Sequence, residues 1–297
     1  MRSLFWLLAL RARACRPATA RDERHGVARR TVAHKLALSS LGSGLPAAAL
    51  ADARIGARTA QTDLVVVRDP ETYSALAYKP KGAAGKLPCL IVLHGAGKNE
   101  DGIWGLCDPR GEHAGLPPSL IAQGKAPKQL TDNFAVVAPY SQGKRSFYEE
   151  PRAKLLRFVD FLISDAGRAA GMPDVDPLRL SLFGFSDGAT VAVELLTTRR
   201  FSHGVVCAYG FTGVLPARAI QSLRGLPLWV FHSADDVIFP VKCADDLVGA
   251  LRAVDAAVVR YDRFDQDQEG FTGSVRGHST GITAAKRPDV YEWLLLT

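Results

Sequence analysis

The pentapeptide Gly-Phe-Ser-Asp-Gly at residues 184–188 restricts the fold of this chain more than any other feature. It follows the apolar run 180–183 and precedes a helix-like stretch that begins at Ala189. A serine between two glycines, placed between a strand and a helix, is typical of a nucleophile held on a sharp turn. The glycines are expected because the backbone turns sharply and neighbouring elements approach closely there. Because the chain contains 27 Gly, the pentapeptide alone could arise by chance, and its interpretation depends on partner residues.

A serine hydroxyl is a weak nucleophile at neutral pH and needs a general base. When the serine lies on such a turn, the acid and then the histidine follow it in the chain. Of the seven His, only His203, His232 and His278 come after Ser186. His203 leaves no good acid before it, and His232 directly precedes the best acids. We therefore expect His278 to be the base, because its glycine-bounded loop can present an imidazole to a strand end.

The acid is expected in segment 231–240, where an apolar strand runs into an acidic turn. Asp235 and Asp236 compete for the role: one would accept a hydrogen bond from the imidazole, and the other would cap the turn. Weaker alternatives lie in a charge-rich loop that is more typical of a solvated surface: Asp262, Asp265, Asp267 and Glu269.

A second apolar run ends in His-Gly-Ala-Gly at residues 94–97, which predicts an oxyanion hole. Acyl transfer places negative charge on a carbonyl oxygen, and removing one fixed N–H donor costs about 3–4 kcal/mol of barrier. We expect the donors to be the backbone N–H groups of Ala96 and Asp187, the second being the residue after the nucleophile. His94 precedes the serine and is expected to be a structural hydrogen-bonding residue instead of the base.

Residues 64–297 resemble α/β-hydrolases of the esterase, phospholipase/carboxylesterase and polyhydroxybutyrate-depolymerase-like kind. The resemblance rests on segments 93–97, 184–188 and 232–240. The last is similar to the family pattern His-Gly-x-x-Asp-x-x-Val-Pro, whose fifth residue is the acid, and this favours Asp236 over Asp235. Two departures stand out. Asp187 occupies a position where Gln or Met is frequent and brings a charge beside the nucleophile, and Ser233 replaces a glycine.

Alternating apolar strands and amphipathic helices predict one α/β domain over residues 54–297. We expect the α/β-hydrolase fold: a mostly parallel central sheet with helices on both faces, an initial antiparallel hairpin and a small loop cap. The expected strands are 64–67, 73–78, 89–93, 134–138, 178–183, 205–209, 228–231 and 258–261. The expected helices are 153–170, 189–199, 242–253 and 289–296.

Three loops that follow strands at the edge bearing the nucleophile are expected to form the cap and to wall the acyl pocket: 99–133, 140–151 and 263–277. Within and beside them, Trp104 and Tyr140 are candidate substrate contacts. Such aromatic rings could equally anchor the loops on the core. Gly95 and Gly97 are further candidates, because small residues let the backbone approach the substrate.

The formal net charge of +7 does not indicate a nucleic-acid enzyme, because the basic residues are concentrated at the N-terminus. Residues 1–58 contain 11 Lys/Arg and 3 Asp/Glu, which leaves 26 and 27 for the remainder of the chain. A short apolar stretch, an Arg- and Ala-rich segment and a twin arginine then predict that residues 1–53 are a cleaved targeting extension. The expected destination is a plastid, with the thylakoid lumen as its innermost site. An exported protein and a disordered tail without an address are the alternatives.

These residues predict a serine hydrolase that cleaves small-molecule carboxylic esters through an acyl-enzyme, without cofactor. No Cys/His spacing suggests a metal site, and no segment predicts a transmembrane helix. A serine peptidase or thioesterase uses the same machinery, and a lyase or haloperoxidase shares the three residues. A catalytically silent binding protein on the same fold is the rival from another class. The sequence predicts no oligomeric state.

Overall fold

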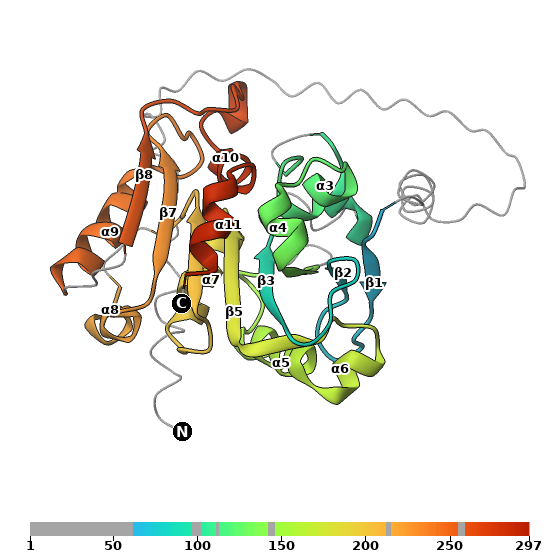
Figure 1. Ribbon diagram of the computed structural model, residues 1–297. Helices are drawn as coiled ribbons and strands as arrows, with labels where there is room; N and C mark the ends of the chain where they lie inside the picture. Colours follow the sequence, from blue (N-terminus) through green and yellow to red (C-terminus); the bar gives the residue numbers. More distant parts are fainter. Residues whose placement is uncertain are drawn as a thin grey trace, which may run out of the picture.

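A computed structural model describes residues 62–96, 102–110, 113–141, 146–211, 215–254 and 259–296. The proposed extension 1–53 and Gly97 lie outside these residues. The centre of the fold is an eight-stranded sheet in the order β1-β2-β4-β3-β5-β6-β7-β8 (Figure 1). The strands are β1 (Val65–Val67), β2 (Ala75–Tyr78), β3 (Leu87–Leu93), β4 (Ala135–Pro139), β5 (Val175–Phe185), β6 (His203–Cys207), β7 (Leu228–Ser233) and β8 (Val259–Phe264).

The sheet confirms the expected α/β-hydrolase topology. β1 pairs antiparallel with β2, and β2 pairs antiparallel with β4, whereas every later pairing is parallel. All eight predicted strands are present, with ends that differ by a few residues. The central strands β4, β6 and β7 are buried along their whole length, as continuous apolar runs predict for strands covered on both faces.

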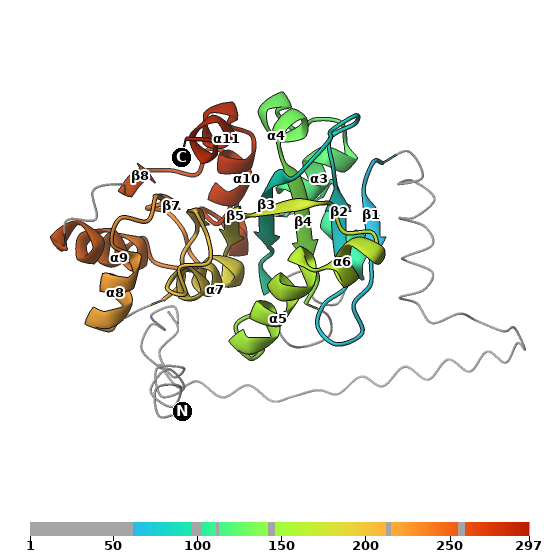
Figure 2. The same ribbon diagram turned by 60° about the horizontal axis from the view of Figure 1, so that its bottom comes forward.

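Helices cover both faces of the sheet (Figure 2). They are α3 (Pro117–Ala122), α4 (Lys128–Asn133), α5 (Arg152–Ile163), α6 (Asp165–Ala169), α7 (Asp187–Leu196), α8 (Ala217–Leu223), α9 (Lys242–Ala253), α10 (Thr280–Ala285) and α11 (Pro288–Leu294), with short 3₁₀ turns η3 (Ile103–Cys107) and η4 (Gly273–Val275). In Figure 2, α5, α7, α8 and α9 lie on one side of the sheet, and α3, α4, α10 and α11 on the other.

Two apolar cores follow from the alternation of side chains along each strand. In β3, Ile91 and Leu93 belong to the core beneath α5, α7 and α9. Leu90 and Val92 belong to the opposite core beneath α3 and α11. The sheet is thereby fixed between two helix layers, and the carboxyl ends of its parallel strands meet at one edge.

One predicted helix was wrong in extent, and several observed helices were not predicted. The helix predicted over 153–170 is two helices, because Ser164 has extended backbone (φ −86°, ψ 164°) and its hydroxyl accepts the N–H of Gly167 at 3.0 Å as the N-cap of α6. The segment 99–133, expected as a cap loop, contains α3 and α4, which pack against a face of the sheet. Pro117 and Pro118 begin α3, where a missing N–H costs little. Helices α8 and α10 were also not predicted.

Among the described residues, none of the helices combines the length and apolarity that crossing a membrane requires.

Candidate active site

Ser186 lies on the turn between β5 and α7 with a strained backbone. Its φ of 56° and ψ of −123° are uncommon for a residue other than glycine. The surroundings hold this conformation: the N–H of Ser186 donates to the carbonyl of Cys207 in β6 at 3.0 Å, and its own carbonyl accepts the N–H of Ala189 at 2.9 Å. The result is a serine at the carboxyl edge of the sheet and at the N-terminus of a helix.

The two glycines that flank this serine are required by close backbone contacts, as the sequence predicts. A Cβ on Gly188 would lie 2.1 Å from the carbonyl oxygen of Leu93, at the end of β3. A Cβ on Gly184 would lie 2.5 Å from the carbonyl oxygen of Gly188. Only glycine therefore lets α7 begin directly against β3.

The structure brings Ser186, His278 and Asp236 together in one hydrogen-bonded chain. The Oγ of Ser186 is 2.9 Å from Nε2 of His278, and Nδ1 of His278 is 2.8 Å from Oδ2 of Asp236. The three residues follow β5, β7 and β8, so the carboxyl ends of parallel strands deliver them to one place. The contacts place the imidazole proton on Nδ1, facing the carboxylate, and leave Nε2 to accept the proton of the serine. All three residues are buried, and His278 is only 2% exposed.

Asp236 is held by donors on both carboxylate oxygens. Its Oδ1 accepts the backbone N–H groups of Ile238 at 2.8 Å and Phe239 at 2.9 Å. Its Oδ2 faces His278 and also lies 3.4 Å from Nε2 of His232. Burial alone would raise the pKa of Asp236, but the hydrogen bonds to His232 and His278 outweigh it, so the pKa lies below its usual range. The carboxylate is thus ionised at neutral pH.

Asp235 takes the structural role that the sequence left open between the two aspartates. Its Oδ1 accepts the hydroxyl of Ser233 at 2.6 Å and the backbone N–H of Asp267 at 3.0 Å. Asp267 in turn accepts the hydroxyl of Ser279, the residue after the imidazole. Asp267 is therefore no simple solvated surface charge, since it ties the histidine loop to the acid turn.

The histidine loop approaches the acid turn closely. Gly277 has a φ of 75°, and a Cβ there would lie 2.3 Å from backbone atoms of both Asp235 and Asp236. The imidazole of His278 lies between two aromatic rings, with centroid distances of 5.2 Å to Phe185 and 5.3 Å to Phe239. These rings pack against the imidazole, whose two nitrogens face Asp236 and Ser186.

His94 has the structural role that its position in the sequence predicts. Its Nδ1 lies 2.7 Å from the carbonyl of Gly95, and its Nε2 accepts the backbone N–H of Ser141 at 3.2 Å. Ala96, the last residue of the described range 62–96, is exposed. The N–H of Asp187 belongs to the first turn of α7, where a helix offers no internal acceptor. Both N–H groups therefore remain the candidate oxyanion donors.

Asp187 carries the charge that distinguishes this chain from the family pattern. Burial raises the pKa of its carboxyl group, and the charge of Glu149 acts in the same direction. A hydrogen bond from Ser146 and the charges of His278 and Arg152 oppose the shift without cancelling it. The ionised form of Asp187, next to Ser186, is therefore less favoured than that of an exposed aspartate.

Near the site, His113 was not among the sequence candidates, and His232 was considered only as the base. A Cβ on Gly95 would lie 2.7 Å from Nε2 of His113 and 3.0 Å from Cβ of Ser186, so His113 packs against the backbone of Gly95. The sequence gives no signal for it, because His113 lies in a Gly/Pro-rich segment. His232 contacts Asp236 from within β7. The sequence shows that His232 begins the family-like pattern, but it does not show that His232 contacts Asp236.

The two aromatic candidates pack on the core. Tyr140 is buried, its backbone N–H donates to the carbonyl of Ser74 at 2.9 Å, and its ring centroid lies 5.7 Å from that of His94. Trp104 is half-buried against the same core as α3. These positions fit the alternative of loop anchors, and a contact of either residue with substrate stays a prediction.

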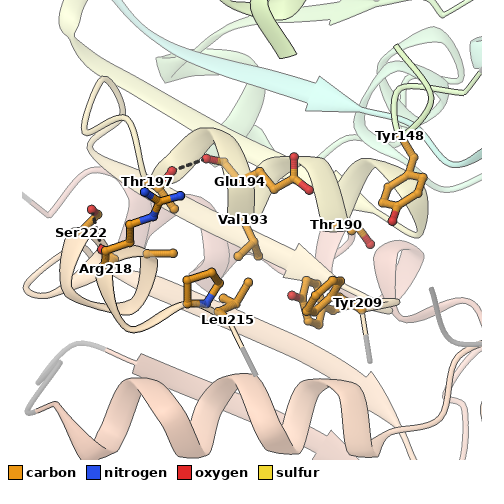
Figure 3. A pocket seen from close by; sticks show the side chains of 12 residues that line it. Tyr148, Thr190, Val193, Glu194, Thr197, Tyr209, Leu215, Arg218 and Ser222 are labelled. Atoms are coloured by element: carbon orange, nitrogen blue, oxygen red, sulfur yellow. Dashed lines mark hydrogen bonds between the residues drawn. The ribbon is translucent and has the colours of Figure 1, made fainter. Parts of the chain in front are cut away.

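A cavity of about 170 Å³ lies beside α7, between this helix and α8 (Figure 3). Thr190 and Val193 line it from α7, and Tyr209 and Leu215 from the segment after β6. The three hydrogen-bonded residues of the site do not line this cavity. Among the described residues, no three His, Cys, Asp or Glu side chains are grouped as a metal site requires.

No protein-family model matches this chain, and no curated protein matches its sequence. Among solved structures, it is similar to a thermostable esterase, with a TM-score of 0.59 and 20% sequence identity over 78% of this chain and 62% of the esterase. It is also similar to a protein from Klebsiella pneumoniae assigned as a dienelactone hydrolase, with a TM-score of 0.53 and 17% identity over 79% of this chain and 98% of that protein.

The chain spans less than two thirds of the esterase, 62% of its length, so the likeness concerns the shared domain. At identities of 20% and 17%, these similarities bear on the arrangement of strands and helices and not on substrate. Together with the sheet order and the serine turn, they identify the chain as a protein of the α/β-hydrolase fold.

Proposed function

We propose that the protein is a serine hydrolase that cleaves carboxylic esters through an acyl-enzyme. The observation that carries the proposal is the chain of hydrogen bonds from Ser186 through His278 to Asp236, at 2.9 and 2.8 Å. This is the geometry required of a nucleophile, its base and the group that orients the base. The likeness in fold to an esterase and to a dienelactone hydrolase agrees with it.

In the proposed reaction, Oγ of Ser186 attacks the ester carbonyl while Nε2 of His278 accepts the hydroxyl proton. The developing oxyanion is bound by the N–H groups of Asp187 and Ala96, each contributing about 3–4 kcal/mol to the lowering of the barrier. His278 then protonates the leaving alcohol, and water hydrolyses the acyl-enzyme by the same proton transfers in reverse order. Asp236 stays ionised and stabilises the imidazolium.

A silent binding protein is disfavoured by the strained conformation of Ser186. Holding a residue other than glycine in such a region costs about 1–3 kcal/mol, which a purely structural turn would not need. Hydrolysis of thioesters or peptides stays an alternative, because the same groups perform it. We propose small or medium acyl esters as the substrates.

The test is turnover of p-nitrophenyl esters of increasing acyl length by the full chain, compared with a thioester and a peptide substrate. Ser186→Ala should abolish turnover. Ser202→Ala is the matched control, because Ser202 precedes the amino end of β6, away from the carboxyl edge of the sheet. It should leave turnover unchanged. A folded wild-type protein that hydrolyses none of these substrates would contradict the proposal.

Residues 1–53 are proposed as a targeting segment for a plastid. A fluorescent protein fused behind these residues should enter plastids, and an export pathway or an unlocalised fusion would overturn this part of the proposal.

A further inference from the structure

We infer that His232 is a positioning residue that holds the carboxylate of Asp236 in line with the imidazole of His278. The inference rests on the proposed function of these groups. His232 lies in β7 and is completely buried. Its Nε2 lies 3.4 Å from Oδ2 of Asp236 and 2.9 Å from the carbonyl oxygen of Phe239. Oδ2 therefore lies between two imidazole rings.

The contacts of the ring assign its proton. Nδ1 of His232 is buried and has no hydrogen-bond partner among the described residues. A buried N–H without an acceptor is costly, so the proton belongs on Nε2, which faces two acceptors. From there the Nε2–H donates mainly to the carbonyl of Phe239 and also points to the carboxylate of Asp236.

The strand makes the ring a rigid support. β7 is paired with β6 on one side and β8 on the other, and His232 itself is in register with Arg263 of β8. Asp236, by contrast, lies on the turn after the strand. The turn itself holds Oδ1 of Asp236 through the N–H groups of Ile238 and Phe239. A donor fixed on a paired strand adds a support on the side of Oδ2, the oxygen that faces His278.

The same ring also acts on the imidazole by a second route. Its Nε2 holds the carbonyl of Phe239, and the ring of Phe239 packs edge-on against His278 at a centroid distance of 5.3 Å. Space there is limited, since a Cβ on Gly210 would lie 2.4 Å from the Phe239 ring. Loss of the Nε2 donor would therefore loosen both Asp236 and the Phe239 ring that packs against His278.

The test compares His232→Gln and His232→Leu in the full chain. The Gln amide can place an N–H near the position of Nε2, whereas Leu fills similar space without a donor. We expect Leu to lower kcat for ester hydrolysis by on the order of 10-fold with KM almost unchanged, because the N–H donor that binds the Phe239 carbonyl and faces the charged carboxylate of Asp236 is lost. Gln should restore most of that loss. The rate of serine labelling by a fluorophosphonate should follow the same order.

Thermal unfolding of each variant separates positioning from folding. If the Leu variant is unfolded, the comparison is made between His232→Gln and His232→Asn, since the shorter Asn amide reaches the place of Nδ1 and should not rescue. Equal kcat values for wild type and for folded His232→Leu and His232→Gln would overturn the inference. An equal loss of kcat in His232→Gln and in the variant compared with it, Leu or Asn, would overturn it as well. An inactive, unlabelled wild type would instead contradict the proposed function itself.

Discussion

Replacing Gly188 by Ala should separate the two elements that carry the proposed oxyanion donors. The new Cβ would lie 2.1 Å from the carbonyl oxygen of Leu93, 2.5 Å from its carbonyl carbon and 2.8 Å from the carbonyl oxygen of His94. All three are backbone atoms, so no side chain can move aside. Since contacts under 3.0 Å are essentially never made by a Cβ, the start of α7 must move from the end of β3 by about 0.9 Å.

This displacement sets the expected size of the effect. Ala96 follows β3, and Asp187 begins α7, so the two expected donors would move apart. A misplacement of about 1 Å in an active site costs roughly 100-fold in rate, which corresponds to about 2.7 kcal/mol of barrier. Forcing an extra methyl group into packed structure also lowers the free energy of unfolding by about 1–3 kcal/mol.

The assay is kcat/KM for a p-nitrophenyl ester, measured together with thermal unfolding. Gly249→Ala is the matched control, because Gly249 lies in α9 and a Cβ there meets nothing within 4 Å. It should raise the free energy of unfolding by about 0.4–1 kcal/mol and leave kcat/KM unchanged. A folded Gly188→Ala protein whose kcat/KM lies within about threefold of wild type would refute the reasoning.

Three further substitutions test the surroundings of the site. Asp187→Asn should raise Tm at pH 8, and this advantage over wild type should disappear toward pH 4. The reason is that the pKa of Asp187 is raised in the folded state, so its carboxyl group contributes stability below its unfolded pKa and loses that contribution as pH rises through the folded pKa. A Tm below that of wild type at pH 8 would argue against this. Asp267→Asn should lower kcat about 3–10-fold by weakening the bond to the Ser279 hydroxyl, and unchanged kinetics would show that this bond does not hold the histidine loop. Arg152→Met should lower the free energy of unfolding in urea by about 1–3 kcal/mol, because Arg152 pairs with Glu194 and binds loop carbonyls; a loss below about 0.5 kcal/mol would indicate an ordinary surface pair.

The strands and the hydrogen-bonded chain of Ser186, His278 and Asp236 could be predicted because their signals are local. Each strand is a short apolar run, and the order of serine, acid and histidine along the chain left one candidate for the base. The choice of Asp236 over Asp235 came from the family-like pattern, and the structure agrees with it, since Asp236 faces His278 and Asp235 caps the turn.

The features that the sequence did not predict depend on contacts between distant segments. Helix α3 begins with two prolines in a Gly/Pro-rich segment, so its six residues carry little helical signal of their own, and packing against β4 and η3 stabilises it. The contact of His232 with Asp236 depends on how the turn folds back on the strand. The position of His113 behind Gly95 depends on tertiary packing, which local patterns do not contain.

The most direct test of the central claim is labelling of the full chain with a fluorophosphonate, followed by peptide mapping of the modified residue. We predict one covalent adduct per chain, on Ser186, which is absent in Ser186→Ala and forms much more slowly in His278→Gln. A folded protein that is not labelled, or whose adduct lies on another serine, would contradict the assignment of Ser186 as the nucleophile.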